Sequence, residues 1–181
     1  MDLIGKMLTL HEALAQPELP HAFGGALALA WCTGEPRATI DIDLNIFVGD
    51  QDMSAALACL PEQIEVSEED RERLARDLQH RLWWDNTPVD VFFNSTDYHD
   101  EVAQRIRWQD FAGATLPFLS CLDLAVFKVF FDRTKDWADL EAMYEAGTLD
   151  APRVSGIIAA YLGIDDPRLK RLADLVQSAS S

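Results

Sequence analysis

The sequence predicts a mixed α/β (α+β) fold, in which a short mixed β-sheet flanked by helices is followed by a C-terminal helical bundle. Residues 39–48 alternate polar and apolar side chains with period two, which indicates a strand. Residues 79–94 form two aromatic and β-branched runs around a turn, which indicates a hairpin. Because the pattern after residue 119 indicates successive helices, we divide the chain into a core of residues 1–119 and a helical region of residues 120–181.

The N-terminal segment is predicted to hold two helices. Apolar residues recur at helical spacing between Leu3 and Leu14, and Pro17 ends this first helix. The pair Gly24-Gly25 follows a short apolar stretch and precedes ALALAW, a run of helix formers. We therefore expect the glycine pair to open the second helix.

The middle of the chain alternates helices and strands. Ser67 and Asp70 have the spacing of a capping box, which opens a highly charged helix. The predicted elements here are, in order, a helix at 52–60, the charged helix from Ser67 to Asp77, the hairpin at 79–94, a helix at 98–106 and one or two short strands within 107–119.

The C-terminal region is predicted to be helical throughout. Ser120 and Asp123 again have capping-box spacing and open an apolar helix that runs to Phe131. A second helical stretch continues to about Ala146, and Gly147 stops it. The remaining helical pieces are punctuated by prolines and a glycine.

The composition limits the classes of function. The net charge is −16 over 181 residues, which argues against broad attachment to nucleic acid or anionic membranes but not against a nucleotide that arrives with divalent cations. Cys32, Cys59 and Cys121 are odd in number and widely spaced, so we expect reduced thiols and no zinc site. With neither a signal-peptide pattern nor a long apolar run, we expect a soluble cytoplasmic protein.

Two carboxylates stand two residues apart on the predicted strand at 39–48. Asp41 and Asp43 would leave the same side of the sheet, while the aliphatic side chains from Ile40 to Val48 would face the core. Like charges held side by side repel unless they are solvated, protonated or bridged by a cation, and Mg²⁺ prefers such oxygen ligands. The alternative is an edge strand whose polar face is solvated.

A third carboxylate interrupts a hydrophobic run. Asp90 lies between Val89 and Val91 in VDVFF, so it must face a polar or metal-filled site, or solvent on an outer strand. Three carboxylates on two adjoining strands have the chemistry to hold two cations about 4 Å apart, as phosphoryl and nucleotidyl transfer require.

The glycine pair offers a place for phosphate. Glycines let a phosphate approach the backbone, and a helix start presents unpaired N–H groups. The alternative is a tight turn. Neither the dinucleotide-binding nor the P-loop glycine pattern is present.

The string FGGALALAWCTGEPRATIDIDLNIFV, followed by TPVDVFF, resembles the polymerase-β-type nucleotidyltransferase superfamily. The closer resemblance is to the minimal nucleotidyltransferases of the AbiEii-like toxin branch, whose typical string R-x-T-x-D-[IL]-D is matched by Arg37, Thr39, Asp41 and Asp43. LSCLDLAVFKVFFDRTKDWADLEAM is similar to a helical stretch of that branch. The matches cover residues 21 to about 143.

The resemblance implies a site residue by residue. Gly24 and Gly25 would pack against a nucleoside triphosphate, Asp41 and Asp43 would bind two Mg²⁺ ions, and Asp90 would bind one of them. Asp90 would also accept the proton of the attacking hydroxyl.

The resemblance also implies roles for later residues. Lys128 would reach the phosphates, and Asp136 or Asp139 would orient it or assist the chemistry. Arg37 and Thr39 would join the nucleotide-binding residues. Helical spacing supports part of this, since it would place Lys128, Asp132 and Asp136 on one face. The alternative for that face is a ladder of surface salt bridges.

One position departs from the superfamily pattern, because Ala26 stands where many members carry Ser or Thr. Phosphate binding would then depend on backbone amides, Lys128 and Arg37.

These observations predict a metal-dependent nucleotidyltransferase that moves a nucleoside monophosphate to a hydroxyl. The acceptor is open: the resemblance implies tRNA and an antitoxin partner, whereas the acidity suits a small cationic molecule. Candidate RNA contacts are Arg105, Arg107, Arg168, Lys170 and Arg171. The alternatives are a non-catalytic nucleotide-binding or toxin–antitoxin module, favoured if the carboxylates are dispersed or salt-bridged, and a small-molecule adenylyltransferase.

Overall fold

The protein is described by a computed structural model that covers residues 1–179. The chain divides into two compact units, one of Met1–Gly25 and Ala38–Leu119, the other of Ala26–Arg37 and the chain from Ser120 on. The expected core of residues 1–119 included residues 26–37, which the structure groups with the C-terminal helices. No helix within the described residues has the length and apolar character needed to cross a membrane.

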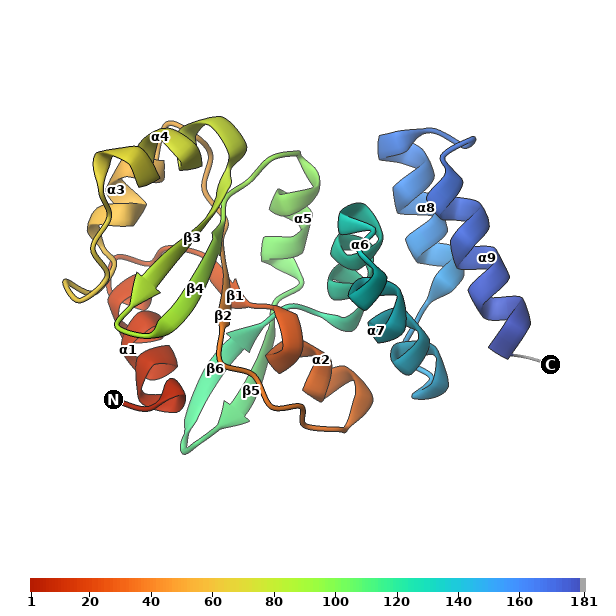
Figure 1. Cartoon of the computed structure of the whole chain (residues 1–181), viewed down its shortest axis with the longest axis horizontal. Coiled ribbons are helices and arrows are strands. Elements are labelled where there is room, and N and C mark those ends of the chain that lie inside the picture. The colour runs from red at the N-terminus through yellow and green to blue at the C-terminus, as the bar shows by residue number, and fades with distance from the viewer. Residues whose placement is uncertain (180–181) are drawn as a thin grey trace. The chain divides into compact units, whose positions relative to one another are not determined.

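The first unit is built on a mixed sheet, and the predicted mixed α/β fold is confirmed. Its six strands lie in the order β3-β4-β2-β1-β6-β5 (Figure 1). The β3–β4 and β5–β6 pairs are antiparallel hairpins, β2 is antiparallel to β1 and parallel to β4, and β1 is parallel to β6. The strands are β1 (His21–Phe23), β2 (Ile42–Ile46), β3 (Gln79–Trp84), β4 (Thr87–Phe92), β5 (Arg107–Phe111) and β6 (Ala114–Phe118).

The helices of this unit follow the predicted patterns. Ser67 and Asp70 form the expected capping box, in which the Ser67 hydroxyl accepts from the Asp70 amide at 3.1 Å and the Asp70 carboxylate accepts from the Ser67 amide at 3.0 Å. The helices are α1 (Leu3–Ala15), α3 (Met53–Ala58), α4 (Glu68–Asp77) and α5 (Tyr98–Gln104).

A buried lysine joins α1 to the β3–β4 hairpin. The Lys6 ammonium donates to the Trp84 carbonyl at 2.7 Å and to the Thr87 hydroxyl at 3.0 Å, and it lies 3.2 Å from the Asp85 carboxylate. These three partners satisfy the donors of a charged group that is otherwise costly to bury. The contact holds the hairpin turn against the first helix.

The strand that carries the acidic pair is shorter than predicted. β2 begins at Ile42 rather than at residue 39, and Ile40 is 76% exposed instead of facing the core. The Thr39 hydroxyl accepts from the Asp41 amide at 3.3 Å and donates to the Asp41 carboxylate. These local side-chain bonds give the backbone an alternative to the sheet ladder.

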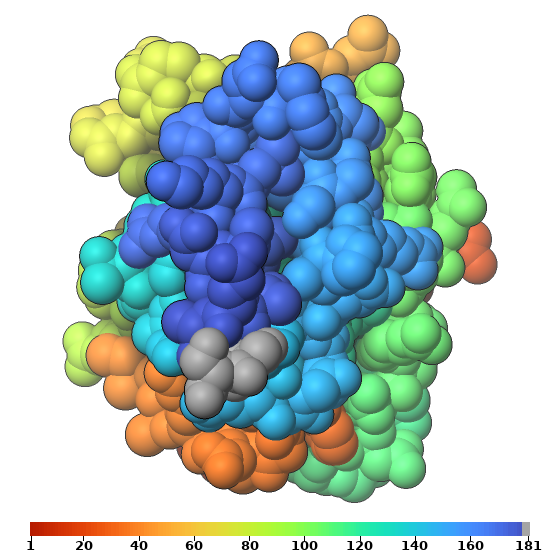
Figure 2. Space-filling model, turned by 90° about the vertical axis from the view of Figure 1, so that its right-hand side faces the viewer, coloured from red at the N-terminus to blue at the C-terminus, as the bar shows by residue number. Residues whose placement is uncertain are grey.

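The second unit is helical. α6 (Cys121–Phe131) packs on α7 (Thr134–Glu145) and α8 (Ala151–Leu162), and α9 (Pro167–Ala179) packs on α7 and α8. Figure 2 shows α8 and α9 side by side on the surface of this unit. α2 (Gly25–Thr33) starts at the last residue of the first unit's opening segment and belongs to the second unit from Ala26 on.

The expectation of three reduced thiols is wrong for two of them. Cys32, near the end of α2, and Cys121, at the start of α6, form a disulfide with their Cα atoms 5.6 Å apart, and Cys59 is free. The fold brings together two cysteines that are 89 residues apart, which their spacing in the sequence did not reveal. The predicted cytoplasmic location rested partly on free thiols and stays a prediction.

The single helical face expected for Lys128, Asp132 and Asp136 is also wrong. α6 ends at Phe131, and Asp132 adopts a left-handed backbone with φ 53° before α7 begins. The turn directs Asp132 to other partners: its carboxylate accepts from the Trp137 indole at 2.6 Å and pairs with Arg171 at 3.0 Å.

Candidate functional site

Two of the predicted metal ligands are neighbours in the sheet. Asp43 on β2 and Asp90 on β4 are register partners in the parallel pair, so their side chains leave the same face. The opposite face of the same two strands carries Ile42, Leu44 and Val91, which are fully buried. The buried apolar face fixes the register and thereby the position of both carboxylates.

Asp41 reaches the same region from the segment before β2. The Thr39 hydroxyl bonds to both the carboxylate and the backbone amide of Asp41. The threonine of the family string is therefore a partner of Asp41. One Asp41 oxygen lies 3.7 Å from a guanidinium nitrogen of Arg81, the residue that also binds Asp90.

Arg81 is the residue of this site that the sequence analysis missed. Its Nε and one terminal nitrogen donate to the two oxygens of Asp90, both at 2.7 Å. These hydrogen bonds are the largest cause that raises the pKa of the Arg81 guanidinium, and the charges of Asp41 and Asp43 add to it. The predicted hairpin could have revealed this pair, because a two-residue turn at Asp85-Asn86 places Arg81 opposite Asp90.

The donor set has the chemistry of a site for a hard divalent cation, but it is not arranged as one. Within residues 1–179, no group of three or more His, Cys, Asp or Glu side chains is placed to hold a metal ion. Asp41 and Asp90 instead share the charge of Arg81, and Asp43 contributes to the same electrostatic field. Carboxylate oxygens are the ligands that Mg²⁺ prefers, so the three side chains suit the ion chemically. The ion can take this position only after the Arg81 guanidinium has left it.

The glycine pair is explained by its closeness to Asp43. The Gly24 amide donates to the Asp43 carbonyl at 2.9 Å, and a Cβ on Gly24 would lie 3.0 Å from the Asn45 amide nitrogen. Gly25 has φ +55°, and a Cβ there would overlap the Asp43 carboxylate. Only glycine at Gly25 lets this carboxylate lie against the start of α2.

The second unit holds the other predicted site residues in a buried ionic network. The Lys128 ammonium donates to Asp139 at 2.6 Å and lies 3.7 Å from Asp136, and all three side chains are buried. The turn after α6 brings Asp136 and Asp139 back to Lys128 from α7. The ammonium is therefore held between two carboxylates inside this unit.

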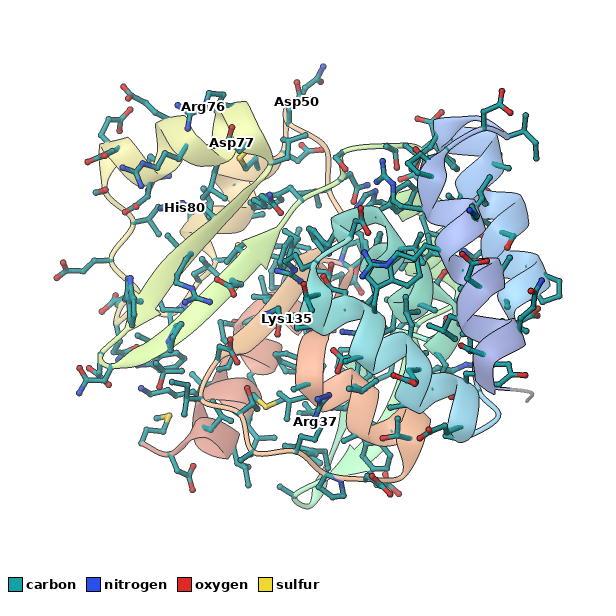
Figure 3. All side chains as sticks on the ribbon, turned by 45° about the vertical axis from the view of Figure 1, so that its right-hand side comes forward. Arg37, Asp50, Arg76, Asp77, His80 and Lys135 are labelled. Atoms are coloured by element: carbon teal, nitrogen blue, oxygen red, sulfur yellow. A yellow bond between two sulfur atoms is a disulfide. The ribbon has the colours of Figure 1, made fainter. Side chains whose placement is uncertain are left out.

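Two arginines complete this network. Arg37, in the loop after α2 (Figure 3), pairs with Asp139. The Arg133 guanidinium donates two hydrogen bonds to the Asp136 carboxylate, at 2.6 and 3.1 Å. Each carboxylate thus has two cationic partners, which makes the burial of both charges tolerable. Arg37, expected at the nucleotide, is here a partner of Asp139.

Two solved structures share this fold. The solution structure of the antibiotic-resistance factor ANT(2'')-Ia matches with a TM-score of 0.60 at 17% identity, over 99% of each chain. An antigenic nucleotidyltransferase-like protein from Paracoccidioides brasiliensis matches with a TM-score of 0.53 at 17% identity, over 98% of this chain and 88% of that one. Comparison with curated protein sequences gives no match.

The family described as "Nucleotidyl transferase AbiEii toxin, Type IV TA system" matches residues 10–178, which is most of the chain. The match includes Asp41, the strands with Asp43 and Asp90, and the helices with Lys128 and Asp139. This chain therefore belongs to the AbiEii nucleotidyltransferase toxin family.

Proposed function

We propose that this protein is a Mg²⁺-dependent nucleotidyltransferase that transfers a nucleoside monophosphate from a nucleoside triphosphate to a hydroxyl and releases pyrophosphate. The observation that carries the proposal is the register of Asp43 and Asp90 on neighbouring strands, with Asp41 directed to the same cationic group. Family membership supports the reaction class.

The acidic residues supply the ligands and the base. Asp41, Asp43 and Asp90 would hold two Mg²⁺ ions, whose positive charge would offset that of the triphosphate and make the attacking hydroxyl easier to deprotonate. The hydroxyl oxygen forms a bond to the α-phosphorus as the bond from that phosphorus to the bridging oxygen breaks. Asp90 takes the hydroxyl proton, and pyrophosphate leaves with the bonding electron pair.

The remaining residues would bind and orient the nucleotide. The backbone at Gly24 and Gly25, where α2 starts, offers amides and the positive end of the helix dipole to phosphate. This suits a chain that has Ala26 in place of a hydroxyl residue. In the second unit, Lys128 is the proposed phosphate-binding lysine, and Asp139 and Asp136 hold its ammonium in place.

The non-catalytic alternative has two observations in its favour: Asp90 is salt-bridged to Arg81, and among the described residues no three His, Cys, Asp or Glu side chains are placed to hold a metal ion. The convergence of Asp43 and Asp90 on one face favours the enzyme. We favour catalysis because Gly25 leaves room for the Asp43 carboxylate, a constraint that a solvated polar face would not need.

Two classes of acceptor are compatible with the proposal. The toxin–antitoxin description of the family supports a cognate antitoxin, and tRNA is the acceptor that the resemblance in the sequence implies. Three candidate RNA contacts are however already ion-paired: Arg105 with Glu101, Arg168 with Asp166 and Arg171 with Asp132. With a net charge of −16, this favours a small cationic acceptor as the second candidate. The fold shared with an antibiotic-resistance factor is consistent with it.

Transfer of label tests the proposal. Nucleoside triphosphates labelled at the α-phosphate are incubated with protein, Mg²⁺ and either tRNA or a set of cationic small molecules. We expect label on one acceptor class, none from γ-labelled nucleotide, and loss of transfer in Asp43→Asn. Asp77→Asn, at the exposed end of α4, is the control that should transfer normally. Transfer of the γ-label instead, or equal transfer by Asp43→Asn, would contradict the proposal.

A further inference from the structure

The guanidinium of Arg81 stands where the proposed reaction needs a metal ion. It forms two parallel hydrogen bonds with Asp90, at 2.7 Å each, and lies 3.7 Å from Asp41. Arg81 projects from β3, at the edge of the sheet, and is the register partner of Asp90. Its side chain is 46% exposed, so it can move away without opening the core.

The pairing has an evident role while no metal is bound. Three carboxylates held near one another repel, and a guanidinium among them offsets that repulsion. Because a planar guanidinium fits a carboxylate with two bonds, it also fixes the orientation of Asp90. The site is therefore stable without a divalent cation.

The same pairing opposes a metal ion. Both oxygens of Asp90 already accept from Arg81, and the positive charge of the guanidinium would repel a second cation placed at the same oxygens. A divalent ion can bind through Asp90 only after this pair breaks. Metal binding then includes the free energy of breaking a bidentate, charge-assisted contact.

We propose that Arg81 is a built-in counter-cation that competes with the divalent metal for Asp90 and leaves it when the metal binds. The inference rests on the proposed function and deepens it, since it assigns Arg81 to control of the metal site. It also accounts for a salt bridge that would otherwise favour a non-catalytic module.

Binding of Mn²⁺ alone, followed by the electron paramagnetic resonance signal of the free ion, tests the inference without any turnover. Arg81→Gln should bind Mn²⁺ about tenfold more tightly than the wild type, because a charge-assisted pair no longer has to break. Arg81→Lys keeps the positive charge but cannot form the two parallel hydrogen bonds, so its Mn²⁺ affinity should lie between those of the wild type and Arg81→Gln.

The chain offers a matched control. Arg76 and Asp77 at the end of α4 (Figure 3) form the same kind of bidentate pair, at 2.9 and 2.8 Å, on an exposed surface. Arg76→Gln removes one positive charge, as Arg81→Gln does, and should leave Mn²⁺ affinity unchanged. Asp43→Asn identifies the site, since binding that survives it belongs to other carboxylates.

The outcomes separate this inference from the function on which it rests. If the wild type and Arg81→Gln bind Mn²⁺ equally through Asp43, or if the variant binds more weakly, the competition is refuted while the metal site stands. If neither protein shows binding that depends on Asp43, the proposed function fails as well.

A second measurement follows the wild type itself and needs a variant only to assign one resonance. The side-chain Nε–H resonance of Arg81, assigned by its absence in Arg81→Lys, should shift when Mg²⁺ is added, because its partner Asp90 is lost. A resonance that stays in place at saturating Mg²⁺ would overturn the inference.

Discussion

At the scale of single residues, Gly25 explains how a carboxylate can approach the start of a helix. The left-handed backbone and the lack of a Cβ together leave the space that the Asp43 carboxylate occupies. The glycine pair therefore acts on the acidic site directly, in addition to any contact with phosphate.

Gly25→Ala is expected to displace Asp43 and to lower nucleotidyl transfer by about 100-fold, as misplacement of a reacting group does. The left-handed backbone alone should cost about 1 kcal/mol of unfolding free energy. Gly34→Ala is the matched control, because Gly34 has φ +73° but nothing within 4 Å of a new Cβ. It should lose similar stability and keep its activity. Equal loss of activity in both variants would contradict the role assigned to Gly25.

Asp90 drew attention because it interrupts a hydrophobic run, and Asp43 and the glycine pair because they match the family pattern. The structure places Asp43 beside Asp90 and against Gly25, and their role at a nucleotide stays a prediction. Arg81 was missed because an arginine on an edge strand is usually solvated, and only the hairpin register shows that it faces Asp90. Thr39 and Arg37 were assigned to the nucleotide, whereas the structure shows them bonded to Asp41 and Asp139.

At the scale of elements, the turn between α6 and α7 determines the ionic network of the second unit. Periodicity predicted both helices, but the left-handed residue Asp132 could not be foreseen from spacing alone. Because the chain reverses there, α7 returns Asp139 to Lys128. The contact therefore depends on tertiary structure.

Asp139→Asn is expected to lower the unfolding free energy by about 3 kcal/mol, because it leaves the buried Lys128 without its nearest charged partner. Asp132→Asn is the control: its pair with Arg171 is about half exposed and should contribute about 1 kcal/mol or less. Denaturant unfolding measures both. Equal, small effects in the two variants would show that the network does not stabilise this unit.

Two histidines connect α1 to β1. The Leu19 carbonyl can only accept, so His21 Nδ1 donates to it at 2.7 Å. In neutral His21, Nε2 then accepts from His11 Nδ1 at 2.9 Å. Burial lowers the pKa of His21 below its ordinary value of 6.5. Protonation of His21 would make its Nε2 a donor, so His11 would have to change tautomer to accept at Nδ1.

Stability is therefore expected to fall on acidification. Below pH 6.5 the unfolded chain binds a proton at this position that the folded protein resists, so the unfolding free energy decreases from pH 7.5 to 5.5. Denaturant unfolding across this range should show a shallower decline in His21→Asn. His11 and His99, whose pKa values burial also lowers, keep part of the slope. An identical slope in the variant would rule out His21 as a source.

At the scale of the whole molecule, the chain is two units whose sequence segments interleave. Composition and periodicity predicted the mixed sheet and the helical C-terminal region. They did not predict that α2 groups with the later helices, because this depends on packing and on the Cys32–Cys121 link between distant segments.

The disulfide predicts how many thiols react in the denatured protein. Protein purified without reductant and then denatured should expose one reactive thiol, Cys59, whereas reduced protein should expose three. Closing a loop this long should stabilise the oxidised form by about 4.6 kcal/mol in the chain-entropy model. Three thiols in unreduced protein, with unchanged stability on adding reductant, would contradict this account.

The central claim is that Asp43 and Asp90 form a metal-dependent centre for nucleotidyl transfer. The most direct measurement is the initial rate of pyrophosphate release from nucleoside triphosphate with acceptor, with and without Mg²⁺. The wild type should release pyrophosphate only with Mg²⁺, and Asp43→Asn and Asp90→Asn should each lower the rate by about 100-fold or more. Release that is independent of Mg²⁺, or rates in both variants equal to that of the wild type, would contradict the claim.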